Sequence, residues 1–221
     1  MSKNIYVVWG TPHHNAKWLS DLDIKICNRP EDADLVLFTG GEDIDPSFYN
    51  EVPNPRTYTN PQRDNFELMH YKYFKNKEIP MIGICRGGQL LTAMVGGKLV
   101  QDSTHPGSHK MYTYDNKIIT INSLHHQQFL IDEKITGLKE GEDYKMIGYA
   151  KCLSPYHCDG DDVDYEFAKT RVDYREPEIT VYPKINALAI QWHPELMSIG
   201  SEAVQYMIGV TDNFLSNKYF K

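Results

Sequence analysis

The sequence of 221 residues has no long hydrophobic run and no excess of basic residues. A membrane span needs about 18 uncharged apolar residues in succession, and no segment approaches that length, so we expect no membrane association. The 23 Lys and Arg residues are outnumbered by 30 Asp and Glu residues, which gives a formal charge of −7. Proteins that follow a phosphate backbone carry clustered basic residues, so nucleic-acid binding is not expected as the main task.

Cysteines are few and widely spaced. The four of them, Cys27, Cys85, Cys152 and Cys158, form no CxxC pair, so neither a disulfide framework nor a thiolate metal site is indicated. The opening MSKNIYVVWG has too short an apolar stretch for a signal peptide. We therefore predict a soluble cytoplasmic protein with free thiols.

Short apolar runs alternate with segments of helical periodicity. Residues 34–39 and 80–84 are continuous apolar runs typical of strands buried on both faces, and residues 61–76 and 89–95 have helical spacing. Strands that alternate with helices indicate a parallel sheet. We predict an α/β fold, a mostly parallel central sheet flanked by helices, in one domain over residues 1–221. Further strands are expected at 5–9, 24–27, 109–114, 117–121, 145–151, 178–182 and 187–192, and a closing helix at 201–215.

Residues 156–175 break this alternation. The segment YHCDGDDVDYEFAKTRVDYR is acidic and has no clear period, so we interpret it as an inserted loop or hairpin. Its DGDDVD part does not match a calcium loop, because glycine falls at the second position instead of the sixth. The paired histidines at 13–14 and 125–126 have no partner at i+4 on a helix, and no metal site is expected.

The strongest local motif is GICRGGQ at residues 83–89, between a predicted buried strand and a predicted helix. A G-x-nucleophile-x-G sequence in that context is typical of a nucleophile elbow, in which a strained turn lifts the side chain out of the sheet. The helix N-terminus would favour the thiolate of Cys85, and the amide of Arg86 would face a developing oxyanion. The alternative is a buried cysteine in a glycine-rich turn.

Two other segments could complete such a site. QWHPE (residues 191–195) follows the last predicted strand, so His193 would lie at the carboxyl edge of the sheet, and Glu195 could orient its ring. Gly40-Gly41 follows a buried strand and could turn an amide toward an oxyanion. Taken alone, the first is compatible with a surface turn and the second with an ordinary tight turn.

Five segments occur together in a family-specific order. They are FTGGEDIDPSFYNE (38–51), RDNFE (63–67), GICRGGQLLTAMVGGKLVQD (83–102), NSLHHQQ (122–128) and QWHPE (191–195). The combination resembles the class I glutamine amidotransferase superfamily, specifically its γ-glutamyl hydrolase branch. The resemblance implies a flavodoxin-like three-layer sandwich and an enzyme that hydrolyses a C–N bond.

The resemblance also implies roles for individual residues. It makes Cys85 the nucleophile, His193 the base and then acid, and Glu195 the orienting carboxylate. The oxyanion hole maps to the amides of Gly41 and Arg86. Residues implied in holding the glutamyl group are Gln89, His125, His126 and Gln127.

The expected reaction is hydrolysis of a γ-glutamyl amide through a γ-glutamyl thioester, with no cofactor and a small-molecule substrate. One alternative is a glutaminase subunit that supplies ammonia to a separate synthetase partner. Another is a catalytically silent ligand-binding protein on the same scaffold. The chain departs from the family in the 156–175 insertion, in a short opening before residue 35, and in Thr92, where an asparagine is common.

Overall fold

A mixed nine-stranded sheet forms the centre of the fold. The computed structural model describes residues 2–103, 107–151 and 174–219. In that part of the chain the strand order is β2-β1-β3-β4-β11-β10-β9-β6-β7. The strands are β1 (Lys3–Val7), β2 (Ile24–Ile26), β3 (Leu35–Phe38), β4 (Met81–Ile84), β6 (Ser108–Thr113), β7 (Ile118–Asn122), β9 (Lys145–Lys151), β10 (Arg175–Tyr182) and β11 (Ala187–Ile190).

The strands from β2 to β11 in this order are mutually parallel, and the remaining four pair antiparallel. The antiparallel part includes the predicted hairpin, in which β6 and β7 are joined through a turn with Asn116 at φ 64°. The predicted α/β class, with a mostly parallel central sheet between helices, is confirmed.

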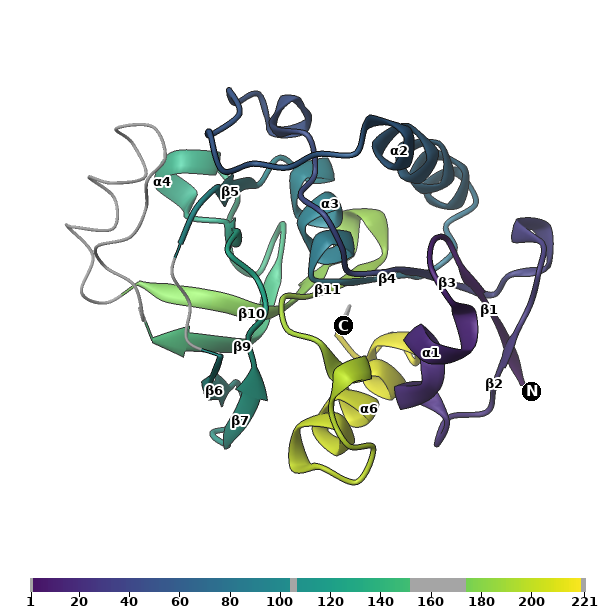
Figure 1. Cartoon of the computed structure of the whole chain (residues 1–221). Helices are drawn as coiled ribbons and strands as arrows, with labels where there is room; N and C mark the ends of the chain where they lie inside the picture. The colour runs from purple at the N-terminus through teal and green to yellow at the C-terminus, as the bar shows by residue number, and fades with distance from the viewer. Residues whose placement is uncertain (1, 104–106, 152–173, 220–221) are drawn as a thin grey trace.

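Helices cover both faces of the sheet and make three layers (Figure 1). Helices α2 (Pro61–Asn76) and α3 (Arg86–Met94) lie on one face, and α1 (Pro12–Ala16) and α6 (Glu202–Leu215) lie on the other. A separate apolar cluster fills each interface. One contains Trp18, Trp192 and Phe214, and the other contains Phe74 and Phe129.

Local sequence explains where the long helices begin. The side chain of Asn60 accepts a hydrogen bond from the Arg63 amide, and Pro61 occupies the first turn of α2, where its missing N–H costs nothing. The Ser201 hydroxyl caps α6 through the amide of Val204. Both are side-chain caps that satisfy amides with no partner inside the helix.

Several boundaries differ from the sequence-based expectation. Helix α3 begins at Arg86, directly after the elbow, instead of residue 89, and β10 begins at Arg175 instead of residue 178. The two-stranded sheet of β5 (Lys98–Val100) with β8 (Gln128–Leu130), and α4 (Glu133–Thr136), were not predicted. Of the proposed insertion at 156–175, residues 156–173 lie outside the described part of the chain. Within that part, no helix is long and apolar enough to cross a bilayer.

Candidate active site

Three adjacent parallel strands bring the predicted residues to one edge of the sheet. Strand β3 leads into Gly40, β4 leads into Cys85, and β11 leads toward His193. A Cβ atom placed on Gly40 would lie 2.6 Å from His193 Cε1 and 3.7 Å from Cys85 Cβ. The turn after β3 therefore packs directly against both side chains, and only glycine leaves room for the imidazole.

Cys85 has the backbone of a nucleophile elbow. Its φ of 47° and ψ of −106° are strained for a residue with a Cβ. The turn is possible because its glycines are closely packed: a Cβ on Gly83 would lie 2.6 Å from the Gly88 nitrogen and would overlap the Gly87 carbonyl. The thiol is buried, and α3 begins at the next residue, so Cys85 is the N-cap residue of that helix.

His193 links Cys85 to Glu195. Its Nδ1 lies 2.7 Å from Glu195 Oε1, and its ring also hydrogen-bonds the Cys85 thiol. Burial lowers the pKa of His193, but the hydrogen bonds and charges of Cys85 and Glu195 outweigh burial and raise that pKa to about 10. The imidazole is therefore held in its charged form at neutral pH, between two groups that can carry negative charge.

The backbone of His193 is fixed from a second direction by Asn122, at the end of β7. Asn122 Nδ2 donates to the His193 carbonyl at 2.8 Å, and the His193 amide donates to Asn122 Oδ1 at 2.9 Å. This amide clamp had no role in the sequence analysis, although Asn122 opens the NSLHHQQ segment on which the resemblance drew.

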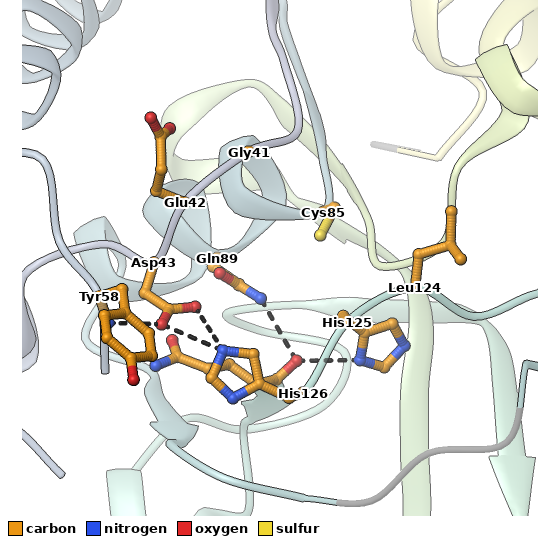
Figure 2. A pocket seen from close by; sticks show the side chains of 10 residues that line it. Gly41, Glu42, Asp43, Tyr58, Cys85, Gln89, Leu124, His125 and His126 are labelled. Carbon is orange, nitrogen blue, oxygen red and sulfur yellow. Dashed lines mark hydrogen bonds and ion pairs between the residues drawn. The ribbon is translucent and has the colours of Figure 1, made fainter. Parts of the chain in front are cut away.

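A cavity of about 220 Å³ opens beside the thiol (Figure 2). The Cys85 sulfur points into it, and the loops after β3 and β7 supply its other walls. The lining residues are Gly41, Glu42, Asp43, Tyr58, Cys85, Gln89, Leu124, His125, His126 and Gln127. All four residues predicted to hold substrate therefore line the cavity that contains Cys85, whereas Arg86, His193 and Glu195 are not among its lining residues.

Two of these four predicted residues, Gln89 and His125, bind the backbone carbonyl of a third, Gln127. Gln89 Nε2 donates to the Gln127 carbonyl at 3.3 Å, and His125 Nδ1 lies 3.0 Å from the same oxygen (Figure 2). That geometry fits an Nδ1–H donor on His125. The two side chains thereby fix the 125–127 turn against α3.

His126 lies at the opposite wall, between two carboxylates. Its Nε2 is 3.0 Å from Asp43 Oδ1, and its Nδ1 is 3.5 Å from Asp102 Oδ1. The hydrogen bond with Asp43 is the main cause that raises the pKa of His126. Glu42 also lines the cavity, but its carboxylate points away from Asp43 and His126 (Figure 2) and accepts a hydrogen bond from Arg63.

Helix α2 and Arg86 form a buried charge network that the sequence analysis did not identify. Arg86 Nη2 donates to Asp64 Oδ1 at 2.5 Å, and its Nη1 donates to Glu67. Burial lowers the pKa of the Arg86 guanidinium to about 10, which still leaves it charged at neutral pH. Arg63 joins the same network through Glu67. The RDNFE segment was the available signal for these residues.

Metal ligation has no support in the described residues, where no group of three or more His, Cys, Asp and Glu side chains could hold an ion. His13 and His14 lie in α1, and His125 and His126 in a loop. The acidic segment considered as a calcium loop lies outside the described part of the chain.

Comparison with known proteins shows the fold and a similarity to one family over part of the chain. The Peptidase C26 family profile matches residues 20–126. The glutamine amidotransferase-like protein YvdE of Lactococcus lactis is 29% identical over 171 residues, which cover 74% of this chain and 66% of that relative. The gamma-glutamyl-CDP-amidate hydrolase of Campylobacter jejuni is 31% identical over 116 residues, which cover 52% of this chain and 50% of that enzyme.

Among solved structures, a glutamine amidotransferase from Thermotoga maritima superposes with a TM-score of 0.55 at 15% identity, covering 100% of this chain and 87% of its own. The three-layer architecture is therefore that of the class I glutamine amidotransferases. In sequence, the chain is similar to the Peptidase C26 family over residues 20–126 and to glutamine amidotransferase-like relatives.

The titration of His193 gives a first test of the geometry. We expect its pKa to lie well above the ordinary value of about 6.5, and to fall in Cys85→Ala and in Glu195→Gln, since each removes a partner that raises it. A pKa raised by folding stabilises the protein fully below about 6.5, and this stabilisation is lost as pH rises through the folded value near 10. Histidine ring NMR between pH 5 and 11 measures the shift.

Cys27→Ala is the matched control, because Cys27 is a free cysteine that interacts with Arg29 and not with the imidazole. An ordinary His193 pKa in the wild-type protein, or one that Cys85→Ala leaves unchanged, would contradict the linked arrangement.

Proposed function

We propose that this protein is a cysteine hydrolase that cleaves γ-glutamyl amide bonds and releases glutamate. The proposal rests on one observation, the linked arrangement of Cys85, His193 and Glu195. The Cys85 thiol, on its strained elbow, is hydrogen-bonded to His193, and His193 is hydrogen-bonded to Glu195. The sulfur faces a cavity. A nucleophile, a base and an orienting carboxylate in this order are what covalent acyl transfer requires. The similarity to a gamma-glutamyl-CDP-amidate hydrolase supports the choice of substrate class.

In the proposed reaction, the Cys85 sulfur attacks the γ-carbonyl carbon and forms a C–S bond. The oxyanion is held by the amides of Gly41 and Arg86. The C–N bond then breaks, and His193 gives its proton to the leaving nitrogen, which leaves a γ-glutamyl thioester. Water next transfers a proton to His193 and attacks the thioester carbon, so that the C–S bond breaks and glutamate leaves. These steps need no cofactor.

The cavity suits the glutamyl half of such a substrate. That half carries an α-ammonium and an α-carboxylate, and the wall offers the carboxylate of Asp43 beside the His126 imidazole, whose pKa is raised. About 220 Å³ is small for a ligand site, which favours a single amino-acid unit over a larger group. Gln89, His125 and Gln127 complete the wall nearest to α3.

The leaving group would lie outside, at the mouth of the cavity. Tyr58 and Leu124 are 73% and 63% exposed there. An exposed aromatic ring beside an exposed aliphatic side chain can pack against a planar group. We therefore propose a conjugate with a large leaving group, such as a nucleotide amidate, as a better substrate than glutamine.

Steady-state release of glutamate from matched compounds tests the proposal. The panel contains glutamine, a γ-glutamyl alkylamine, γ-glutamyl-CDP-amidate and an α-glutamyl amide as the isomeric control. We expect kcat/KM for at least one γ-conjugate to exceed that for glutamine by 10-fold or more, with no turnover of the α-isomer. Tyr58→Ala should reduce that preference and leave slow glutamine hydrolysis unchanged.

Other outcomes would select the alternatives. Hydrolysis of glutamine alone, increased by an added synthetase, would indicate a glutaminase subunit. An absence of turnover across the panel, together with a Cys85 that alkylates no faster than a simple thiol, would indicate a binding protein and overturn the proposal.

A further inference from the structure

Arg63, in the first turn of α2, holds the loop that carries Gly41. Its Nη2 donates to the carbonyl oxygens of Thr39 at 3.1 Å and Gly40 at 2.9 Å, and to the Thr39 hydroxyl at 3.0 Å. Its Nη1 donates to Glu42 at 2.8 Å. One guanidinium thus contacts the residues on both sides of Gly41, and its side chain is only 3% exposed.

The backbone conformation of Gly41 and its lack of a side chain allow this contact with Arg63. Its φ of 150° is a conformation that other residues rarely adopt, and a Cβ there would overlap Arg63 Nη1. The loop therefore lies directly on the guanidinium. With the carbonyls of Thr39 and Gly40 held by Arg63, the orientation of the peptide between Gly40 and Gly41, and hence of the Gly41 amide, is restricted.

The other proposed oxyanion amide is linked to the same network. Arg63 Nε donates to Glu67 Oε1 at 2.8 Å, and the Arg86 side chain donates to the second oxygen of that carboxylate. Glu67 is fully buried. A single carboxylate on α2 therefore ties the loop after β3 to the first residue of α3.

We infer that Arg63 is a positioning residue that fixes the Gly41 amide, and that Glu67 sets its spacing from the Arg86 amide. This rests on the proposed function, in which those two amides form the oxyanion hole. Arg63 does not itself line the cavity, but it holds Gly41 and Glu42, which do. It would therefore act on the transition state through the loop and not by binding substrate. A lysine at this position keeps the charge but lacks the planar fork needed for all these acceptors.

Arg63→Lys should therefore lower kcat about 100-fold, as expected for a displaced oxyanion donor, and change KM less than about 3-fold. Thr39→Val, which removes one of the three acceptors of Nη2 and nearly preserves shape, should lower kcat by a smaller factor. Alkylation of Cys85 by iodoacetamide forms no oxyanion and should proceed at the wild-type rate in both. Arg175→Gln is the control, because it breaks an exposed ion pair with Glu140 and neither residue lines the cavity.

Hydrogen exchange of residues 39–43 gives a readout independent of activity. In Arg63→Lys these amides should exchange at least about 10-fold faster than in wild type and in Arg175→Gln, while the core strand β4 is unchanged. Unaltered exchange, unaltered kcat, or a kcat loss matched by slower alkylation would each overturn the inference. If wild type turns over no γ-glutamyl compound, the proposed function fails, and the exchange result still decides whether Arg63 positions the loop.

Discussion

Cys85→Ala is expected to reduce glutamate release by a factor of about 10⁴ or more, because the covalent route is lost with the sulfur. The fold should persist. The side chain is small, the replacement keeps its Cβ, and the hydrogen bonds from the Cys85 amide to Ile190 and from Gln89 to the Cys85 carbonyl belong to the backbone. We therefore expect the circular dichroism spectrum to stay close to that of wild type, and the urea midpoint to fall only by the stabilisation that His193 gains from Cys85.

Cys27→Ala provides the matched control, since it removes the other described free cysteine and should retain full activity. Wild-type turnover by Cys85→Ala would exclude the thiol as nucleophile. Loss of activity in Cys27→Ala as well would indicate that cysteine replacement disturbs the protein in general.

Gly87→Ala is expected to give the largest loss of stability. A Cβ on Gly87 would lie 2.6 Å from the carbonyl carbon of Phe38 and would overlap its oxygen, and both atoms belong to the backbone of β3. Neither can rotate away, so α3 and β3 would have to separate. We expect the free energy of unfolding to fall by about 3 kcal/mol or more, and activity to be lost because the elbow moves.

Gly209→Ala separates this effect from that of alanine itself. Gly209 lies inside α6, and a Cβ there would have no atom within 4 Å. Alanine should therefore stabilise the helix by about 0.5–1 kcal/mol. Urea unfolding of both variants measures the two changes; equal and small effects would contradict the close packing of the elbow.

That Cys85 and His193 meet at one edge of the sheet could be predicted largely from their positions after buried strands in the sequence. Cys85 and His193 each follow an apolar run that could be recognised as a buried strand, and carboxyl ends of neighbouring parallel strands meet at one edge. The structure places these residues and Glu195 in contact. Their catalytic roles remain predictions.

Other features depend on contacts between distant segments. The pairing of β5 with β8 joins two strands of three residues, too short to show a period. Helix α3 begins at Arg86 although Gly87 and Gly88 are poor helix formers, because the glycines allow contact with β3. Likewise, Asp43 and His126 form one wall of the cavity although 83 residues separate them.

The sequence also did not predict the contacts of Arg63, Glu67 and Asn122, because these too depend on the tertiary fold. Arg63 and Glu67 lie at i and i+4 on α2, a spacing that alone suggests an ordinary helix salt bridge. Only the tertiary fold shows that the pair is buried under the Gly40-Gly41 turn. Asn122 likewise acquires its contact with His193 only when β7 and the end of β11 come together.

The most direct test of the account is intact-protein mass spectrometry after rapid mixing with the best γ-glutamyl conjugate and acid quenching. We predict a transient adduct of one glutamyl unit, located on Cys85 by peptide mapping, that decays as glutamate appears and is absent in Cys85→Ala. Glutamate release with the adduct on another residue, or undiminished release from Cys85→Ala, would contradict the proposed thioester route.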